Sequence, residues 1–322
     1  MNNKFYPMNS AEVLDRVLDI YKRSFWQQIG LSIIFNIMFM AAMYILLFVG
    51  LIATVVAVGA AFAPGSAGTM SAGGVVFIGV LIILFLFSIS AYTALLSTGN
   101  ALITKHTFLG DRCDVGKVIK ESFKKIWVAT SAVLANVIVM IPGIIVLSVF
   151  VYLYIFFIGA VIDGGGIGYW PIVIVSILFI LLVIGFFVAF TTITMLSMPA
   201  AIFEGKWFFA AFKRGFSLAQ YDFVKLMGVV TIWILAVYAL SYSIEMIFGI
   251  GSAMMMAFAP AESAMFMYFG MMGVRFILTM VVSVIVAPLS GIFYTMIYIN
   301  QRFKHEGLDV ELNLNALRRI NG

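Results

Sequence analysis

Long stretches without any charged residue are the feature that most constrains how this chain can fold. No aspartate, glutamate, lysine or arginine occurs within Ser24–Thr104, Ile126–Ile162, Gly164–Phe203 or Phe276–Gln301. About 20 apolar residues in a helix are enough to cross the hydrocarbon core of a bilayer, so each stretch can hold one or two crossings. Only 10% of the residues are charged, whereas about 25% are charged in an ordinary soluble domain. The sequence therefore predicts a polytopic integral membrane protein.

These stretches are continuously apolar, which predicts helices, because the strands of a membrane barrel would alternate apolar and polar residues. We expect an all-α polytopic membrane protein in which residues 1–322 form a single membrane domain and residues 302–322 its cytoplasmic tail. The six expected transmembrane helices are Ile29–Phe62, Gly74–Ile103, Trp127–Val161, Pro171–Phe203, Leu226–Ile250 and Gly273–Ile299.

The distribution of basic residues predicts the orientation. Every lysine and arginine except Arg275 lies in the N-terminal segment, in the two connections on the same side of the predicted crossings, or in the C-terminal tail. The three opposite loops contain none. Because cytoplasmic loops are enriched in lysine and arginine, we expect a multi-pass protein of the cell membrane with both termini in the cytoplasm.

A basic amphipathic segment precedes the first, third and fifth predicted crossings. These segments lie within Ala11–Gly30, Cys113–Thr130 and Pro199–Gly228. We interpret the chain as three parallel hairpin repeats, each an interfacial amphipathic helix followed by two crossings, with units at about residues 8–105, 106–204 and 205–301. Two crossings return the chain to the side on which it started, so the three units would share one orientation.

The amphipathic segments give the predicted cytoplasmic side a basic surface. Helices with one apolar and one basic face commonly lie in the headgroup layer of a membrane. Two interpretations stay open: the basic residues anchor and orient the bundle, or they bind anionic lipids or a protein partner. The candidate lipid- or partner-binding residues are Arg16, Lys22, Arg23, Lys117, Lys120, Lys124, Lys213 and Arg214.

Glu245 and Arg275 are charged residues expected in or near the membrane. They have opposite sign and stand on neighbouring predicted helices, so they are a candidate intramembrane ion pair. Alternatively, Arg275 contacts an anionic headgroup or solute, because charges within a membrane are costly and usually functional. Asn36 and Asn136 are also expected inside the membrane, where each either bonds to another helix or lines a polar pathway.

Both ends of the chain carry local signals. Asn9 followed by Glu12 has the spacing of a capping box at the start of the first helix. After the sixth crossing, the mixed-charge tail is either a solvated helix end broken at Gly307 or a segment that docks on the interfacial helices.

Two segments, Met198–Val229 and Ala287–Leu312, match short motifs of a known family. The matching residues are Pro199, Glu204, Gly205, Ala211, Lys213, Arg214, Leu218, Phe223 and Gly228 in the first segment and Pro288, Tyr298, Arg302, Glu306, Gly307, Leu308 and Asp309 in the second. These segments resemble the membrane domain attached to some bacterial glycerophosphodiester phosphodiesterases and the stand-alone relatives of that domain. Relatives usually have an aspartate where Asn300 stands.

The resemblance implies no chemistry in this chain, because catalysis in the fused enzymes belongs to a separate barrel with metal-binding carboxylates and histidines. Such a barrel needs about 250 residues, and the sequence contains only two histidines, His106 and His305. It also lacks a phosphate loop, metal-ligand spacing and a nucleophile–base set. We predict no enzymatic activity, no cofactor, no metal ion and no nucleic-acid partner.

The expected function is that of a non-catalytic scaffold or accessory subunit. Its basic cytoplasmic face would bind membrane lipids, anionic ones above all, or a protein partner on the cytoplasmic side. The alternative is a transporter or channel for a small or lipidic solute, although the predicted crossings offer few polar side chains to line a path.

Overall fold

The structure, a computed structural model, describes residues 5–61, 72–111, 113–163, 170–257 and 264–321. Over these ranges the chain is helical and has no strand. The loops expected opposite the basic side fall mostly outside them. The helices are α1 (Ser10–Ala61), α2 (Ala72–Leu109), α3 (Val115–Lys124), α4 (Ile126–Asp163), α5 (Trp170–Glu204), α6 (Phe209–Ala219), α7 (Phe223–Ala257), α8 (Ala264–Glu306) and α9 (Leu308–Asn321), with a 3-10 turn, η1 (Gln220–Asp222), between α6 and α7.

Six of the described helices, α1, α2, α4, α5, α7 and α8, are long and apolar enough to cross a membrane. The predicted crossings fall within these helices, apart from Phe62, which lies outside the described residues. The expectation of an all-helical, multi-pass membrane protein is therefore confirmed. Even α5, with 35 residues, would be about 52 Å long at about 1.5 Å per residue, whereas the hydrocarbon core is about 30 Å thick. Helices of this length either tilt in the membrane or extend beyond its hydrocarbon core.

The expectation of a separate interfacial helix at the start of the chain is wrong. The segment Ala11–Gly30 forms the first turns of α1, which continues without a break to Ala61. No proline or turn sequence interrupts this stretch, so nothing ends the helix where it meets the apolar residues. The capping box is confirmed, because the Glu12 amide donates to Asn9 Oδ1 at 2.9 Å and the Asn9 amide donates to Glu12 Oε2 at 3.0 Å.

The two later amphipathic segments do form separate short helices. Asp114 caps α3, and its side chain accepts a hydrogen bond from the Gly116 amide at 3.0 Å. Before α6, the chain turns through Gly205 and Phe208, which have positive φ values of 66° and 47°. Both short helices therefore begin after local backbone features that separate them from the preceding long helix.

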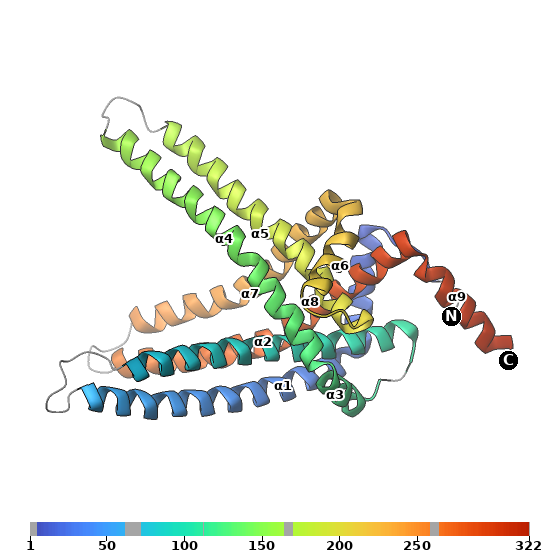
Figure 1. Cartoon of the computed structure of the whole chain (residues 1–322), viewed down its shortest axis with the longest axis horizontal. Coiled ribbons are helices and arrows are strands. Elements are labelled where there is room, and N and C mark those ends of the chain that lie inside the picture. Colours follow the sequence, from blue (N-terminus) through green and yellow to red (C-terminus); the bar gives the residue numbers. More distant parts are fainter. Residues whose placement is uncertain (1–4, 62–71, 112, 164–169, 258–263, 322) are drawn as a thin grey trace.

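The long helices come together at one end of the molecule and spread apart toward the other (Figure 1). Helix α1 packs on α2 and α8, α2 on α4, α4 on α5, and α7 on α5 and α8. The α4–α5 pair points away from α1, α2, α7 and α8 (Figure 1). The short helices α3, α6 and α9 all lie at the end where the helices converge, which we call the basic end because of its lysines and arginines.

The largest buried core also lies toward the basic end. It contains Val17, Ile20, Leu218, Phe293 and Tyr298, which come from α1, α6 and α8. In contrast, the other halves of the long helices expose large apolar side chains, including Phe48, Ile83, Phe156, Leu178 and Ile247. A soluble protein rarely exposes apolar patches of this extent, whereas the hydrocarbon core of a membrane solvates them.

Small residues allow the helices of the core to approach closely. A Cβ atom placed on Gly215 of α6 would lie 2.7 Å from the Ser197 amide nitrogen and 2.9 Å from the Ile193 carbonyl oxygen of α5. A Cβ on Gly291 of α8 would lie 2.7 Å from Cβ of Asn100 on α2. Close backbone contacts through small residues are a common way to join helices in membranes.

We expect Gly215→Ala to lower the thermal stability of the protein, because the obstacle to the new methyl group is the α5 backbone, which cannot move aside. Overpacking of this kind typically costs about 1–3 kcal/mol. The measurement is the melting temperature of purified protein in detergent. Gly228→Ala is the matched control, because a Cβ at Gly228 of α7 meets nothing within 4 Å. Equal melting temperatures for the two variants would contradict the tight packing of α6 on α5.

Candidate functional site

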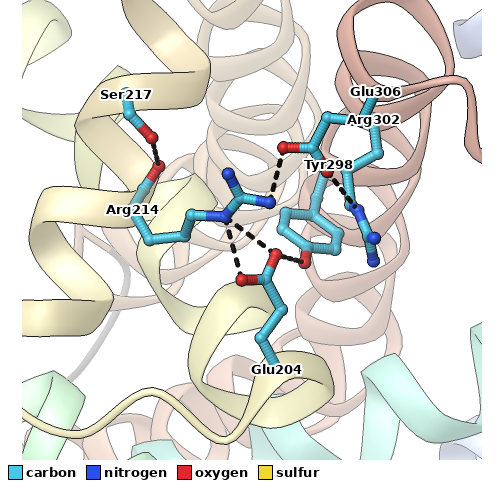
Figure 2. A network of polar contacts seen from close by, with 6 residues as sticks. All are labelled: Glu204, Arg214, Ser217, Tyr298, Arg302 and Glu306. Atoms are coloured by element: carbon cyan, nitrogen blue, oxygen red, sulfur yellow. Dashed lines mark hydrogen bonds and ion pairs between the residues drawn. The ribbon is translucent and has the colours of Figure 1, made fainter.

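The two motif segments, which are about 90 residues apart in the chain, meet at the basic end. Glu204 and Arg214 come from the first segment, and Tyr298, Arg302 and Glu306 come from the second. Figure 2 shows their side chains pointing toward one another. We call these five residues the motif cluster.

The positions of the two glutamates follow from how their helices end. Glu204 is the last residue of α5 and Glu306 is the last residue of α8. Each is followed by a glycine, Gly205 or Gly307, with a φ of 66°. Glycine is the residue that adopts positive φ without steric cost and is strongly preferred just after a helix. The Glu-Gly pairs thus end the helices and leave both carboxylates at their last turn.

Arg214 of α6 lies between the two carboxylates. Its Nε donates to both carboxylate oxygens of Glu204 at 2.9 Å, and its Nη2 lies 2.5 Å from Glu306 Oε1. The side chains are only partly exposed, at 26% for Arg214 and 15% for Glu204. Removing one partner from such a pair leaves an uncompensated charge away from water, which is strongly destabilising.

Two residues of α8 complete the motif cluster. The Tyr298 hydroxyl donates to Glu204 Oε1 at 2.6 Å, and Arg302 Nε donates to Glu306 Oε2 at 2.8 Å. The motif cluster contains two carboxylates and two guanidinium groups, so its formal charge is balanced. Since its members come from α5, α6 and α8, it fixes the relative positions of these helices at the basic end.

The remaining motif residues position α9. Gly307 turns the chain, the Val310 amide donates to the Gly307 carbonyl oxygen at 3.1 Å, and Asp309 stands in the first turn of α9. An acidic residue in the first turn is favoured by the helix dipole. Leu308 packs against the main core. The tail thus breaks at Gly307 and continues as α9, which packs against α8; its docking on the interfacial helices stays a prediction.

Two asparagines hold the N-terminal segment against α8 and α9. Asn300 Oδ1 accepts a hydrogen bond from the Met8 amide at 2.8 Å, and its Nδ2 donates to the Met8 carbonyl at 3.0 Å. Asn313 of α9 makes the same pair of bonds with Phe5, at 3.2 and 2.8 Å. A carboxylate could accept from the amide but could not donate to the carbonyl, so the amide at position 300 suits this contact.

The predicted basic face is distributed over three helices. Lys22 and Arg23 of α1, Lys117, Lys120 and Lys124 of α3, and Lys213 of α6 are exposed. Asp19 lies 3.8 Å from Arg16 and 3.0 Å from Arg23. Arg214 differs from the others because both its carboxylate partners lie inside the motif cluster.

The structure places Glu245 and Arg275 far from the motif cluster, toward the opposite end of α7 and α8. Arg275 Nη2 lies 3.7 Å from Glu245 Oε2, and the side chains are 66% and 37% exposed for Arg275 and Glu245. Exposed ion pairs usually contribute little to stability, about 0–1 kcal/mol in water. Whether these residues act as a pair stays a prediction.

Both intramembrane asparagines make hydrogen bonds between helices. The Tyr92 hydroxyl of α2 donates to Asn36 Oδ1 of α1 at 2.9 Å. Asn136 Nδ2 of α4 lies 2.9 Å from Ser197 Oγ of α5. Asn136 also lines a cavity of about 170 Å³ between α2, α4, α5 and α8, together with Ser97, Thr191, Thr194, Tyr294 and Thr295. The two interpretations of this residue are therefore compatible.

Lys105, which lies toward the end of α2 near the motif cluster, was not among the predicted site residues. Its Nζ stands 5.7 Å from the centre of the Phe203 ring. One signal was available: Lys105 precedes Gly110 by the same interval that separates Arg302 from Gly307.

Among the residues that the structure describes, no group of three or more histidine, cysteine or carboxylate side chains could hold a metal ion.

Comparison of the chain with protein-family models, curated proteins and solved structures gave no match. The resemblance of the two motif segments therefore stays a prediction, and the candidate site is argued from its own geometry.

We expect Asn300→Asp to lower the melting temperature, because a buried carboxylate would face the Met8 carbonyl oxygen instead of donating to it. Leaving a buried group unsatisfied typically costs about 1–3 kcal/mol. Acidification should restore part of the loss, since a protonated carboxyl group can donate again. Gln220→Glu makes the same amide-to-acid change at an exposed position and should change the melting temperature little. An Asn300→Asp variant as stable as the wild type would show that the Met8 contact contributes nothing.

Proposed function

We propose that the protein is a non-catalytic membrane scaffold or accessory subunit whose basic end binds anionic membrane lipids or a protein partner. The observation that carries this proposal is a row of exposed lysines on α3. Lys117, Lys120 and Lys124 are exposed, and none of them forms an ion pair with a described residue. Glu121, the acidic residue of α3, instead pairs with Lys125 at 3.0 Å. The three ammonium groups are therefore available to phosphate groups or to carboxylates of a partner.

Exposed aromatic side chains at the basic end support a position in the headgroup layer. Phe123 and Trp127 are 40% and 63% exposed, and Trp207, Phe209 and Phe216 around α6 are 56%, 49% and 47% exposed. Aromatic side chains are enriched at membrane–water interfaces, next to basic residues on the cytoplasmic side. In this proposal, the basic end faces the cytoplasm of the cell membrane.

The ends of three long helices support the proposed repeat. Helices α2, α5 and α8 are each followed at once by a glycine with positive φ: Gly110 at 80°, and Gly205 and Gly307 at 66°. These glycines are the positive-φ glycines of the described chain, and each stands where a hairpin unit would end. A common origin of the three units as parallel hairpins would explain this shared ending.

A second candidate function, movement of a small or lipidic solute, is favoured by the cavity beside Asn136. Hydroxyl groups of Ser97, Thr191, Thr194 and Thr295 gather there among otherwise apolar helices. If this cavity lies on a transport path, reconstituted protein should accelerate the exchange of a fluorescent phospholipid between leaflets. Thr194→Val should slow that exchange, and equal rates with and without protein would remove this candidate for lipids.

The scaffold proposal predicts that the α3 lysines determine which lipids or proteins co-purify with the protein. We expect wild-type protein extracted directly into lipid nanodiscs to carry more anionic lipid than the bulk membrane, or a stoichiometric protein partner. Changing Lys117, Lys120 and Lys124 together to Gln should abolish that enrichment. The same three positions changed to Arg keep the charge and should retain it. Identical lipid and protein profiles for all three proteins, by mass spectrometry, would contradict the proposal.

Cys113, next to α3, offers a test of the proposed orientation. Burial of its side chain and the neighbouring Asp114 carboxylate raise the pKa of the Cys113 thiol above its ordinary value. Because the thiolate is the reactive form, labelling by maleimide should be slow at neutral pH and should accelerate as the pH rises. With the basic end in the cytoplasm, a membrane-impermeant maleimide should label Cys113 only after the cells are opened.

Asp114→Asn isolates the electrostatic part of this effect. The amide oxygen can still accept from the Gly116 amide, so the cap of α3 remains, but the negative charge is gone. Removing the charge lowers the pKa of the thiol, so the variant should react faster than the wild type at neutral pH. The difference should vanish at a pH where both thiols are ionised. If Cys113 were labelled in intact cells at the rate seen in opened cells, the basic end would face the outside of the cell, contrary to the proposal.

A further inference from the structure

We propose that a pocket between α2, α8 and α9 at the basic end binds a phosphate-bearing anion, the phosphodiester group of an anionic phospholipid. This inference rests on the lipid-binding function proposed above and assigns it a defined site. The pocket has a volume of about 220 Å³. Lys105 and Arg302 line it together with apolar side chains that include Phe108, Phe203, Leu308 and Leu312.

Two aromatic rings hold the two cations of the pocket. The Lys105 ammonium lies 5.7 Å from the centre of the Phe203 ring, and the Arg302 guanidinium carbon lies 5.9 Å from the centre of the Tyr298 ring. The two rings are themselves stacked, with centres 5.9 Å apart and planes inclined by 28°. Both cations therefore rest on one aromatic stack, which restricts where their remaining donors can point.

Both cations have donors left over for a ligand. Arg302 uses Nε for Glu306, while its two terminal nitrogens form no hydrogen bond with a described residue and point away from the motif cluster (Figure 2). Lys105 likewise forms no ion pair with a described residue. Guanidinium and ammonium groups are the donors that proteins use to bind phosphate oxygens, and this pocket is lined by one of each.

The charge of the pocket matches a phosphodiester. Glu204 and Glu306 balance Arg214 and Arg302 within the motif cluster, so Lys105 adds one uncompensated positive charge. Among the described residues, no carboxylate lines the pocket. A phosphodiester carries a single negative charge and would neutralise this site, whereas a carboxylate-rich ligand would bring an excess of negative charge next to two glutamates.

The size and walls of the pocket favour a lipid head over a bare ion. Its volume of about 220 Å³ equals that of roughly seven water molecules at about 30 Å³ each, which is enough for a phosphate and a few carbon atoms. Leu308 and Leu312 of α9 and Phe108 of α2 offer apolar contacts to those carbons. The acyl chains would leave the pocket toward the apolar surface of the helices.

The test is a titration of purified protein in a neutral detergent with a short-chain phosphatidylglycerol, read by native mass spectrometry. We expect one tightly bound lipid per wild-type protein and a loss of affinity of about tenfold or more for Lys105→Gln, since a charge-assisted hydrogen bond is removed. Lys105→Arg should retain the lipid. Lys225→Gln, which removes a charge of α7 that is 83% exposed and lies outside both the pocket and the α3 face, should leave the affinity unchanged. An unchanged melting temperature for Lys105→Gln would show that its loss of lipid affinity does not come from unfolding.

Competition by inorganic phosphate identifies the source of the phosphate group. If millimolar phosphate displaces the lipid, the site belongs to a soluble phosphate; if it does not, the site belongs to the lipid. Equal weakening by Lys105→Gln and Lys225→Gln would overturn the pocket in favour of diffuse attraction, and so would an unaffected Lys105→Gln variant.

The failure of this inference differs from failure of the proposed function. If lipid enrichment is lost in the α3 variant but not in Lys105→Gln, the result supports binding by the α3 lysines and contradicts the pocket. If it is lost in Lys105→Gln alone, the result supports the pocket and contradicts a role of the α3 lysines.

Discussion

The ion pairs of Arg214 with Glu204 and Glu306 are the interaction on which the arrangement of the basic end depends. Each carboxylate is the last residue of a long helix, so one guanidinium group on α6 connects the ends of α5 and α8. The next residue, Gly215, allows α6 to lie directly on the α5 backbone. The ion pairs thus set where α6 lies along the two helix ends, and the absence of a side chain at Gly215 sets how closely α6 approaches α5.

This arrangement separates structural charges from available ones. Arg214 and Arg302 are held by carboxylates within the motif cluster, whereas Lys117, Lys120 and Lys124 face outward on α3. Helix α3 itself is fixed by apolar contacts, including buried Val118 and an edge-to-face contact of Phe123 with Phe35 of α1 at 6.3 Å. Anchoring through one face leaves the basic face free, which is what a surface for lipids or partners requires.

Much of the fold could be predicted from the sequence, because charges are too costly in hydrocarbon to occur by chance inside a crossing. The uncharged stretches therefore located six helices. The continuity of α1 was not predicted, since an amphipathic pattern tells which face is polar but not whether the helix ends. The motif residues Glu204, Arg214 and Glu306 were picked out, but Arg214 was also assigned to the exposed basic surface. Its partners depend on how α6 packs, which no local pattern specifies. Asn300 and Lys105 were missed as contact residues for the same reason.

The contacts of the N-terminal segment have a consequence for how the protein is made. Met8 and Phe5 find their partners, Asn300 and Asn313, at sequence separations of 292 and 308 residues. The backbone groups of Phe5 and Met8 therefore find these partners only after residues 300–313 have been synthesised. Until then, the six helices can insert one after another while residues 5–8 stay uncontacted by the two asparagines. A chain that stops before Asn300 would keep this segment free, where quality-control proteases could recognise it.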